Sequence, residues 1–226
     1  MPQSTESKQS SQLHGAADPA TPSGRPGKIV CIGRNYREHA KELGNEVPTE
    51  PMFFLKPPSS VISSGQSILL PEQSDQVDFE GEIGVVIGSV LSRGSESEAE
   101  RAIAGVIAVN DVTARDLQRK DSQWTRAKGF DTFCPVGSVS VGPYELGDLT
   151  VVTRVNGVER QRASSAEMVF PIRKLLSYVS HVMTLEPGDI VATGTPSGVA
   201  PLAAGDIVEV EIVGLSRVIN PVEARA

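Results

Sequence analysis

Residues 77–88 read VDFEGEIGVVIG, and this stretch places two carboxylates at the start of a strongly apolar segment. The run from Ile83 to Ile87 has the β-branched character of a strand that is buried on both faces. Unpaired anions are very unfavourable in such surroundings. The stretch therefore predicts a buried β-strand, and it requires something that neutralises Glu80 and Glu82.

Most of the remaining sequence is typical of strands and turns. Residues 150–161, TVVTRVNGVERQ, predict a β-hairpin with an Asn-Gly turn, and two later strands each follow a Gly-Asp turn. Helical patterns occur over residues 35–44, 95–105 and 171–182, with Asn35 as the expected cap of the first helix and Gly44 just past its end. The sequence therefore predicts an α+β fold that is mainly β.

The composition suits one folded domain with a tail in front of it. Residues 1–27 are rich in Ser, Gln, Pro, Gly and Ala and predict a disordered N-terminal tail. A transit peptide is the alternative, although Glu6, Asp18 and the scarcity of arginine argue against it. Residues 28–226 are then expected to form one folded domain.

Charge and cysteine content limit the partners and the compartment. The net charge is −7 at pH 7 and the basic residues are scattered, which argues against binding to nucleic acid or to an anionic membrane. Cys31 and Cys134 lack the spacing of a zinc site or of a disulfide framework. No apolar stretch approaches the roughly 20 residues that span a bilayer. We expect a cytoplasmic protein with no membrane or nucleic-acid partner.

Three carboxylates form the first candidate site. Side chains two residues apart on a strand point to the same face about 6–7 Å apart, so Glu80 and Glu82 converge, while Gly81 opposite them permits close packing. Such a pair alone is more often solvated on an edge strand. Asp111, at the polar end of the strand predicted over residues 105–111, adds a third hard oxygen ligand. The set favours Mg²⁺ or Mn²⁺, with positions left for a chelating 2-oxo acid.

Two histidines of the predicted domain have to be weighed. His39 and Glu42 are spaced i, i+3 on the first helix, so their side chains can meet. This is either an ordinary surface contact or a dyad in which Glu42 orients His39 to take a proton from water. His181 lies near the end of an apolar helix, where a helix-terminal or core histidine is the favoured interpretation.

Six segments, in their order along the chain, resemble the fumarylacetoacetate hydrolase family. They are CIGRNYREHAKEL, EPMFFLKP, VDFEGEIGVVIG, VNDVTARDLQ, RAKGFDTFCPVG and TGTPSGV, and the resemblance covers residues 28–220. The arrangement is most similar to the small single-domain branch that contains acylpyruvate hydrolases and oxaloacetate decarboxylases. The resemblance implies a mixed β-sandwich roll with few short helices, as a homodimer.

The resemblance also implies roles for particular residues. In the family, positions that match Glu80, Glu82 and Asp111 bind Mg²⁺ or Mn²⁺, and those that match His39 and Glu42 activate water in the hydrolytic members. The expected roles of the other matched residues are enolate stabilisation by Lys128 and binding of substrate carboxylate or oxo groups by Arg34, Gln118 and Thr195.

The implied function is a Mg²⁺- or Mn²⁺-dependent hydrolase that cleaves the carbon–carbon bond of acylpyruvates, which are 2,4-dioxo acids. Decarboxylation of oxaloacetate, a lyase reaction, reaches the same metal-bound pyruvate enolate and is expected together with hydrolysis or in its place. One alternative is an isomerase or decarboxylase of 2-hydroxymuconate-type dienoates in aromatic catabolism. Another is a metal-binding family member without catalysis, because a fold alone does not establish a function.

Overall fold

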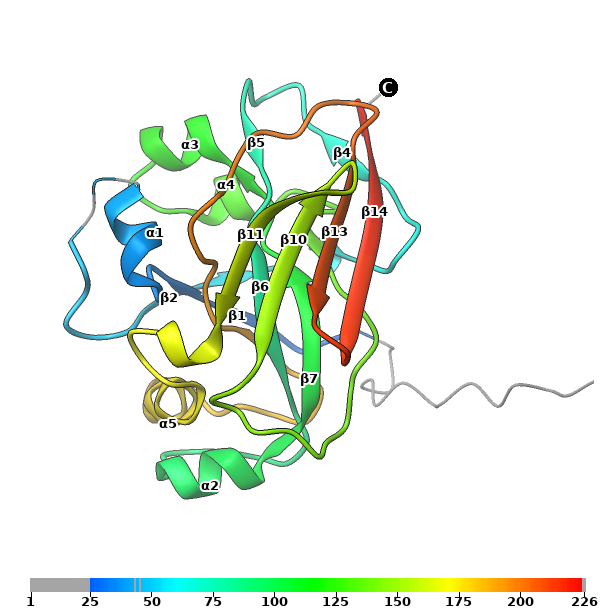
Figure 1. Cartoon of the computed structure of the whole chain (residues 1–226). Helices are drawn as coiled ribbons and strands as arrows, with labels where there is room; N and C mark the ends of the chain where they lie inside the picture. The colour runs from blue at the N-terminus through cyan, green and yellow to red at the C-terminus, as the bar shows by residue number, and fades with distance from the viewer. Residues whose placement is uncertain (1–24, 43, 45, 225–226) are drawn as a thin grey trace, which may run out of the picture.

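The structure is a computed structural model that describes residues 25–42, 44 and 46–224, with only the backbone of Ala40. Residues 1–24, most of the predicted tail, lie outside the described residues. In the described part, strands β1 to β14 are accompanied by the short helices α1 to α5 (Figure 1). The prediction of an α+β fold that is mainly β is confirmed.

Two five-stranded sheets form the body of the domain, and both are mixed. The first contains, in spatial order, β2 (Met52–Lys56), β1 (Ile29–Gly33), β12 (Ile190–Ala192), β6 (Gly81–Ile87) and β7 (Ile103–Asn110). The second contains β11 (Val158–Ser164), β10 (Thr150–Val155), β13 (Ile207–Ile212), β14 (Ser216–Ala224) and β4 (Ile68–Leu70). Two small ladders join β3 (Val61–Ile62) to β9 (Cys134–Pro135) and β5 (Val77–Asp78) to β8 (Thr113–Ala114).

The helices lie at two places around the sheets (Figure 1). One pair consists of α2 (Glu96–Arg101) and α5 (Ile172–Val182). The others are α1 (Arg37–Glu42), α3 (Arg115–Lys120) and α4 (Thr125–Lys128). Helix α2 begins with a capping box, in which the side chains of Ser95 and Glu98 each accept a hydrogen bond from the other residue's backbone N–H. Among the described residues, no helix has both the length and the apolar character needed to cross a membrane.

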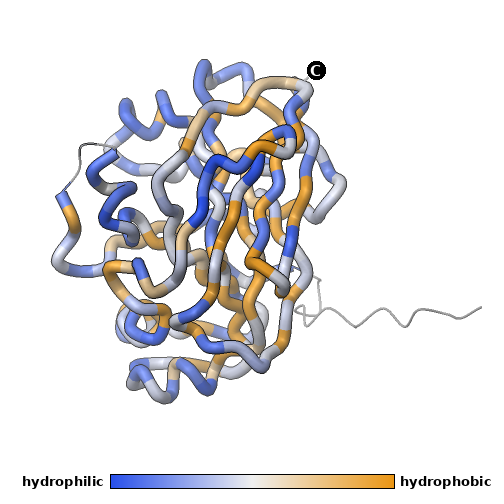
Figure 2. Tube along the Cα trace, viewed as in Figure 1, coloured by the Kyte–Doolittle hydropathy of each residue, from blue (hydrophilic) through white to orange (hydrophobic). Residues whose placement is uncertain are grey.

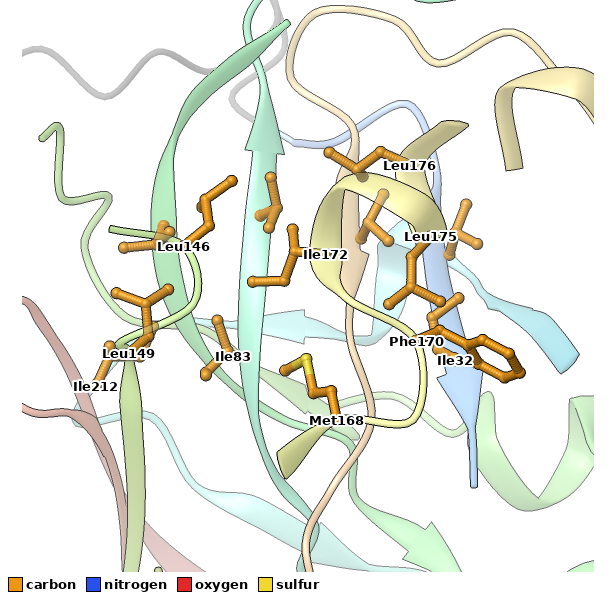
Figure 3. Close-up of a cluster of buried hydrophobic side chains, with 14 of the residues drawn as sticks. Ile32, Ile83, Leu146, Leu149, Met168, Phe170, Ile172, Leu175, Leu176 and Ile212 are labelled. Atoms are coloured by element: carbon orange, nitrogen blue, oxygen red, sulfur yellow. The ribbon is translucent and has the colours of Figure 1, made fainter. Parts of the chain in front are cut away.

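The main core fills the space between the two sheets and α5. Figure 3 shows Ile83 of β6, Ile212 of β13, and Leu175 and Leu176 of α5 in one cluster. These side chains are almost completely buried, and the burial of Ile83 agrees with the buried strand that the apolar run of residues 83–87 predicts. Figure 2 shows the same division along the chain, with hydrophobic strands inside and largely hydrophilic α1 and α2 outside.

The turn chemistry expected from the sequence is confirmed. Asn156 and Gly157 have φ angles of 52° and 77° and join β10 to β11 as an antiparallel hairpin. The strands β12 and β13 begin directly after the two Gly-Asp pairs.

The start of the first helix differs from its prediction. The helix begins at Arg37, and Asn35 is not its cap. The buried Asn35 amide instead donates to the carbonyl oxygens of Thr193 at 2.8 Å and of Phe170 at 3.2 Å. Its Oδ1 accepts from the Phe170 N–H at 2.9 Å. The Asn35 side chain thus bonds two loops that are distant in the sequence, and these bonds fix the β1–α1 connection. Gly44 does follow the helix, with a φ of 68°.

Candidate active site

The nine residues predicted for the site line a single cavity of about 400 Å³. They are Arg34, His39, Glu42, Glu80, Glu82, Asp111, Gln118, Lys128 and Thr195. The rest of the lining comes from Ile32, Gly33, Phe54, Arg115, Arg119 and Trp124. Residues far apart in the sequence are therefore brought together as the motifs suggest.

A change of strand partner positions the three carboxylates. The stretch predicted as one strand is broken at Phe79 and Glu80, because β5 pairs with β8 whereas β6 pairs with β7. The Glu80 N–H donates to Asn110 Oδ1 at 3.0 Å, and the Asp111 N–H donates to the Glu80 carbonyl at 2.8 Å. Glu80, Glu82 and Asp111 each offer an oxygen within 4.8 Å of the others, and all three are buried. The alternative of a solvated edge strand is therefore wrong.

Gly81 gives this segment its close contact with the second sheet. A Cβ at this position would lie 1.9 Å from Thr153 Oγ1, so no larger residue fits without displacement. The expected close packing behind the carboxylates is confirmed.

Two buried lysines neutralise part of the acidic cluster. Lys128 Nζ lies 2.7 Å from Glu80 Oε2 and 2.6 Å from Asp111 Oδ2. Lys56 Nζ lies 2.6 Å from Asp111 Oδ1 and donates to the Val112 carbonyl at 3.0 Å. Burial opposes the charged form of Lys128, but Asp111 and Glu80 outweigh it and raise its pKa. Lys128 is thus a charged donor at the acidic end of the cavity.

Arg115 is a site residue that the sequence reasoning missed, although it lies inside one of the family motifs. Its Nη2 lies 2.5 Å from Glu80 Oε1, and its Nε lies 2.8 Å from Asp78 Oδ2. Its Nη1 donates to Gln118 Oε1 at 2.5 Å. Because the Gln118 oxygen is engaged, its amide N–H groups are the atoms left for a substrate.

Glu82 differs from its two neighbours because no cation among the described residues pairs with it. It accepts one hydrogen bond, from the Gly194 N–H at 2.8 Å. Burial, followed by repulsion from Asp111 and Glu80, raises its pKa well above the ordinary value. Burial also opposes ionisation of Glu80, but Lys128 and Arg115 outweigh it and hold that pKa well below its usual range.

The charges and the donor set fit a divalent cation. Four buried carboxylates, those of the cluster and of Asp78, face three buried cations, Lys56, Arg115 and Lys128. Each carboxylate oxygen has a second lone pair, so the observed hydrogen bonds leave acceptor capacity. Converging carboxylate oxygens with one uncompensated negative charge suit a hard ion such as Mg²⁺ or Mn²⁺.

His39 and Glu42 form a hydrogen-bonded pair at the cavity. His39 Nδ1 and Glu42 Oε2 are 3.1 Å apart, and Glu42 Oε1 accepts from the Gly198 N–H at 3.0 Å. His39 is only 4% exposed, so an ordinary surface contact does not describe it. If Nδ1 carries the proton towards Glu42, Nε2 is free to act as a base. His181 is exposed, bonds the Ser177 carbonyl on its own helix and is not among the lining residues.

Gln161 supports the site from the second sheet, and no sequence signal marks it. Its Nε2 donates to Thr195 Oγ1 at 2.8 Å, and its Oε1 accepts from the Gly81 N–H at 3.0 Å. Thr195 Oγ1 in turn donates to the Gly81 carbonyl at 2.9 Å. Since that hydroxyl proton is already used, Thr195 offers the cavity an acceptor rather than a donor.

One protein family matches almost all of the described residues. Residues 28–223 match the family model described as fumarylacetoacetate (FAA) hydrolase, C-terminal. The match covers both sheets and every lining residue of the cavity.

Individual relatives carry names of different reactions. A 2,4-didehydro-3-deoxy-L-rhamnonate hydrolase of Sphingomonas sp. (strain SKA58) is 44% identical over 198 residues, 82% of this chain and 70% of that protein. An oxaloacetate tautomerase, mitochondrial FAHD1 of Arabidopsis thaliana, is 43% identical over 204 residues, 88% and 92% of the two chains. The solved 5-carboxymethyl-2-hydroxymuconate delta-isomerase from Mycobacterium smegmatis superposes with a TM-score of 0.83 at 42% identity, covering 89% and 80%. The predicted fold type is confirmed.

Proposed function

This chain belongs to the fumarylacetoacetate hydrolase family, and on that premise we propose that it is a Mg²⁺- or Mn²⁺-dependent enzyme that hydrolyses the carbon–carbon bond of acylpyruvates. The observation that carries the proposal is the hydrogen-bonded pair of the buried His39 and Glu42's carboxylate, which opens onto the same cavity as the three carboxylates. A hydrolase needs a base for water next to its substrate, and this pair supplies one.

The acidic cluster is the proposed metal site. Glu80, Glu82 and Asp111 would hold the ion, which when bound supplies Lewis-acid chemistry to the carboxylate and 2-oxo oxygens of a substrate.

The remaining groups would carry out proton transfer and charge stabilisation. His39 Nε2 takes a proton from water, which attacks the distal acyl carbonyl, and the Glu42 carboxylate stabilises the imidazolium that forms. The bond between that carbonyl carbon and the next carbon breaks, and its electron pair enters the pyruvate enolate. The Lys128 ammonium and the free Gln118 amide group would donate to the enolate oxygen. The proton that His39 took from water passes to the enolate carbon and gives pyruvate, which returns His39 to its neutral form, and the acyl group leaves as a carboxylic acid.

Oxaloacetate is the second proposed substrate. Its decarboxylation produces the same enolate without water, so it needs Lys128 and the cation site but no water-activating base. Interconversion of its keto and enol forms is a further candidate, favoured by the tautomerase that shares 43% identity over 92% of its own length. A base and an ammonium donor on one cavity, His39 and Lys128, suit such proton transfers.

One experiment tests the proposal directly. Purified protein is mixed with acetylpyruvate in Mg²⁺ and again in excess EDTA, and loss of the diketone absorbance is followed with oxaloacetate in parallel. We expect magnesium-dependent release of pyruvate and acetate. If oxaloacetate alone reacts, the hydrolase proposal is wrong and decarboxylation or tautomerisation remains.

The Glu42→Ala variant separates the two reactions. Loss of the orienting carboxylate should lower acetylpyruvate hydrolysis at least ~10-fold, because acid–base catalysis contributes roughly 10²–10⁴-fold. Decarboxylation should stay within about a factor of two, because it needs no activated water. Glu38→Ala is the matched control, since Glu38 lies on the same helix but is exposed and pairs with Lys41. Equal loss of both activities in Glu42→Ala would contradict the assigned role.

A further inference from the structure

The loop that follows β12 contacts both parts of the proposed active site. It reads TGTPSG over residues 193–198. The Gly194 N–H donates to Glu82 Oε2 at 2.8 Å, and this is the one hydrogen bond that Glu82 accepts among the described residues. At the end of the loop, the Gly198 N–H donates to Glu42 Oε1 at 3.0 Å. One short loop therefore bonds a carboxylate of the acidic cluster and the carboxylate of the proposed dyad.

Both glycines are enclosed by other elements, and both have a backbone conformation that favours glycine. Gly194 has a φ of 101°, and an added Cβ would lie 2.7 Å from Asn35 Cβ in the β1–α1 connection. Gly198 has a φ of 100°, and an added Cβ would lie 2.2 Å from the Arg160 carbonyl oxygen on β11. The loop thus lies between the β1–α1 connection and the edge strand β11 (Figure 1).

Gln161 of β11 bonds the middle of this loop. Its Nε2 donates to Thr195 Oγ1 and to the Pro196 carbonyl, each at 2.8 Å. Its Oε1 accepts from the N–H of Gly81, between two carboxylates of the acidic cluster, at 3.0 Å. Both amide N–H groups and the amide oxygen are therefore engaged, and they join the loop to the segment that carries the carboxylates. The side chain is 1% exposed and does not line the cavity, so it is not a substrate contact.

Thr153 offers a comparison at the same place. It pairs with Gln161 in the β10–β11 ladder and is also buried. Its Oγ1 lies against Gly81, as Gln161 Oε1 does, but it has no hydrogen-bond partner among the described residues. Thr153 therefore shares the burial and the neighbour of Gln161 and lacks its bonds to the loop.

We propose that Gln161 is a positioning residue for both parts of the site and acts through the loop of residues 193–198. The inference rests on the proposed function, because it takes Glu82 as a metal ligand and Glu42 as part of the water-activating dyad. By holding the middle of the loop against β11, the Gln161 amide keeps the two glycine N–H groups within hydrogen-bond distance of their carboxylates. Metal affinity and water activation then depend on one amide of the second sheet.

Two variants remove the bonds of Gln161 to the loop. Gln161→Glu keeps the length of the side chain and an oxygen for the Gly81 N–H, but it has at most one donor where the amide has two. Gln161→Met removes donors and acceptor together and keeps the inference testable if the buried carboxylate prevents folding. Thr153→Val is the matched control, since it changes a buried group on the paired strand that makes no bond to the loop.

Amide hydrogen exchange of the metal-free protein, followed by nuclear magnetic resonance, is the deciding measurement. The Gly194 amide should exchange at least ~10-fold faster in both variants of Gln161, because the loop opens locally. The amides of β6 should stay within about a factor of two of the wild type. A glutamine that served only the stability of the fold would speed exchange at both places together.

Two further measurements connect the loop to the metal and to the reaction. Mn²⁺ affinity, measured by electron paramagnetic resonance, should fall about 10-fold, the lower end of the effect of outer partners of metal ligands. In saturating Mn²⁺, kcat for acetylpyruvate should also fall at least ~10-fold, because small displacements of a catalytic group are costly in rate. Thr153→Val should leave all three quantities within about a factor of two.

Several results would overturn the inference. They are unchanged Gly194 exchange in both variants of Gln161, equally faster exchange throughout β6, unchanged Mn²⁺ affinity, and the same changes in Thr153→Val. Failure of the proposed function appears elsewhere, as absence of acetylpyruvate hydrolysis by the wild type. Faster Gly194 exchange and weaker Mn²⁺ binding in a protein that hydrolyses no acylpyruvate would keep the positioning role and remove the hydrolase.

Discussion

Two groups of ion pairs with similar distances lie in different surroundings in this protein. At the acidic cluster, Asp111 pairs with Lys56 and with Lys128 at 2.6 Å, and all three side chains are buried. On the second sheet, Arg154 pairs with Glu209 at 2.8 Å, and Glu209 pairs with the half-exposed Arg217 at 2.9 Å. The N–O distances are nearly the same in the two groups, but the exposure of the side chains to water differs. The charges around Asp111 are almost completely buried and those on the second sheet are not, so of these two groups only the first should impose large costs when altered.

Lys56→Met should give the largest loss of stability. The substitution leaves Asp111 with one oxygen unpaired in a buried site, and breaking such pairs costs about 3–5 kcal/mol. Urea unfolding of metal-free protein measures the loss. A cost below ~1 kcal/mol would mean that Asp111 is rescued by a proton or by water, and the contrast between the two groups would collapse.

Glu82→Gln tests the carboxylate of the acidic cluster that pairs with no cation among the described residues. Metal affinity should fall on the order of 100-fold or more, since even outer partners of metal ligands contribute 10–100-fold. Titration with Mn²⁺ followed by its electron paramagnetic resonance signal measures the affinity. Unchanged affinity would remove Glu82 from the proposed metal site.

Glu82→Gln should also change how the stability of the metal-free protein depends on pH. Because the pKa of Glu82 is raised in the folded state, its favourable contribution is present below the ordinary glutamate pKa and is lost as the pH rises through the folded value. Metal-free wild type should therefore lose stability from acid towards neutral pH, and Glu82→Gln should reduce that slope. Thermal melts between about pH 5 and 8 measure it, with Mg²⁺ restoring only the wild type.

Gly81→Ala should have an intermediate effect. A Cβ there would meet Thr153 Oγ1 at 1.9 Å, and overpacking of this kind costs about 1–3 kcal/mol. Gly147→Ala is the matched control, because nothing lies within 4 Å of the Cβ it would add. Denaturant midpoints compare the two. Equal midpoints would show that the second sheet moves to accommodate the added methyl group with little loss of stability.

The sequence predicts this fold best where local chemistry decides the structure. The Asn156-Gly157 hairpin and the capped start of α2 need only their own residues. Asn35 shows the limit, since a plausible local cap is overridden by bonds to Phe170 and Thr193, more than a hundred residues away.

The candidate site likewise contains some residues that the sequence predicts and others that it does not. The three carboxylates could be found because acids in apolar strands need an explanation. Lys56, Arg115 and Gln161 could not, because a lysine, an arginine or a glutamine in a sequence is ordinarily exposed. Their burial depends on which strands become neighbours, and that is a property of the whole fold.

Arg154→Gln should give the smallest effect and completes the contrast. Its partners Glu209 and Glu211 keep contact with water, so the loss should be about 0–1 kcal/mol. At ~1 M salt, where screening acts over about 3 Å, even this difference should shrink, whereas the cost of Lys56→Met should persist. Urea unfolding of both variants at low and high salt makes the comparison. If Arg154→Gln proves as costly as Lys56→Met, network geometry rather than burial sets the strength of ion pairs in this fold.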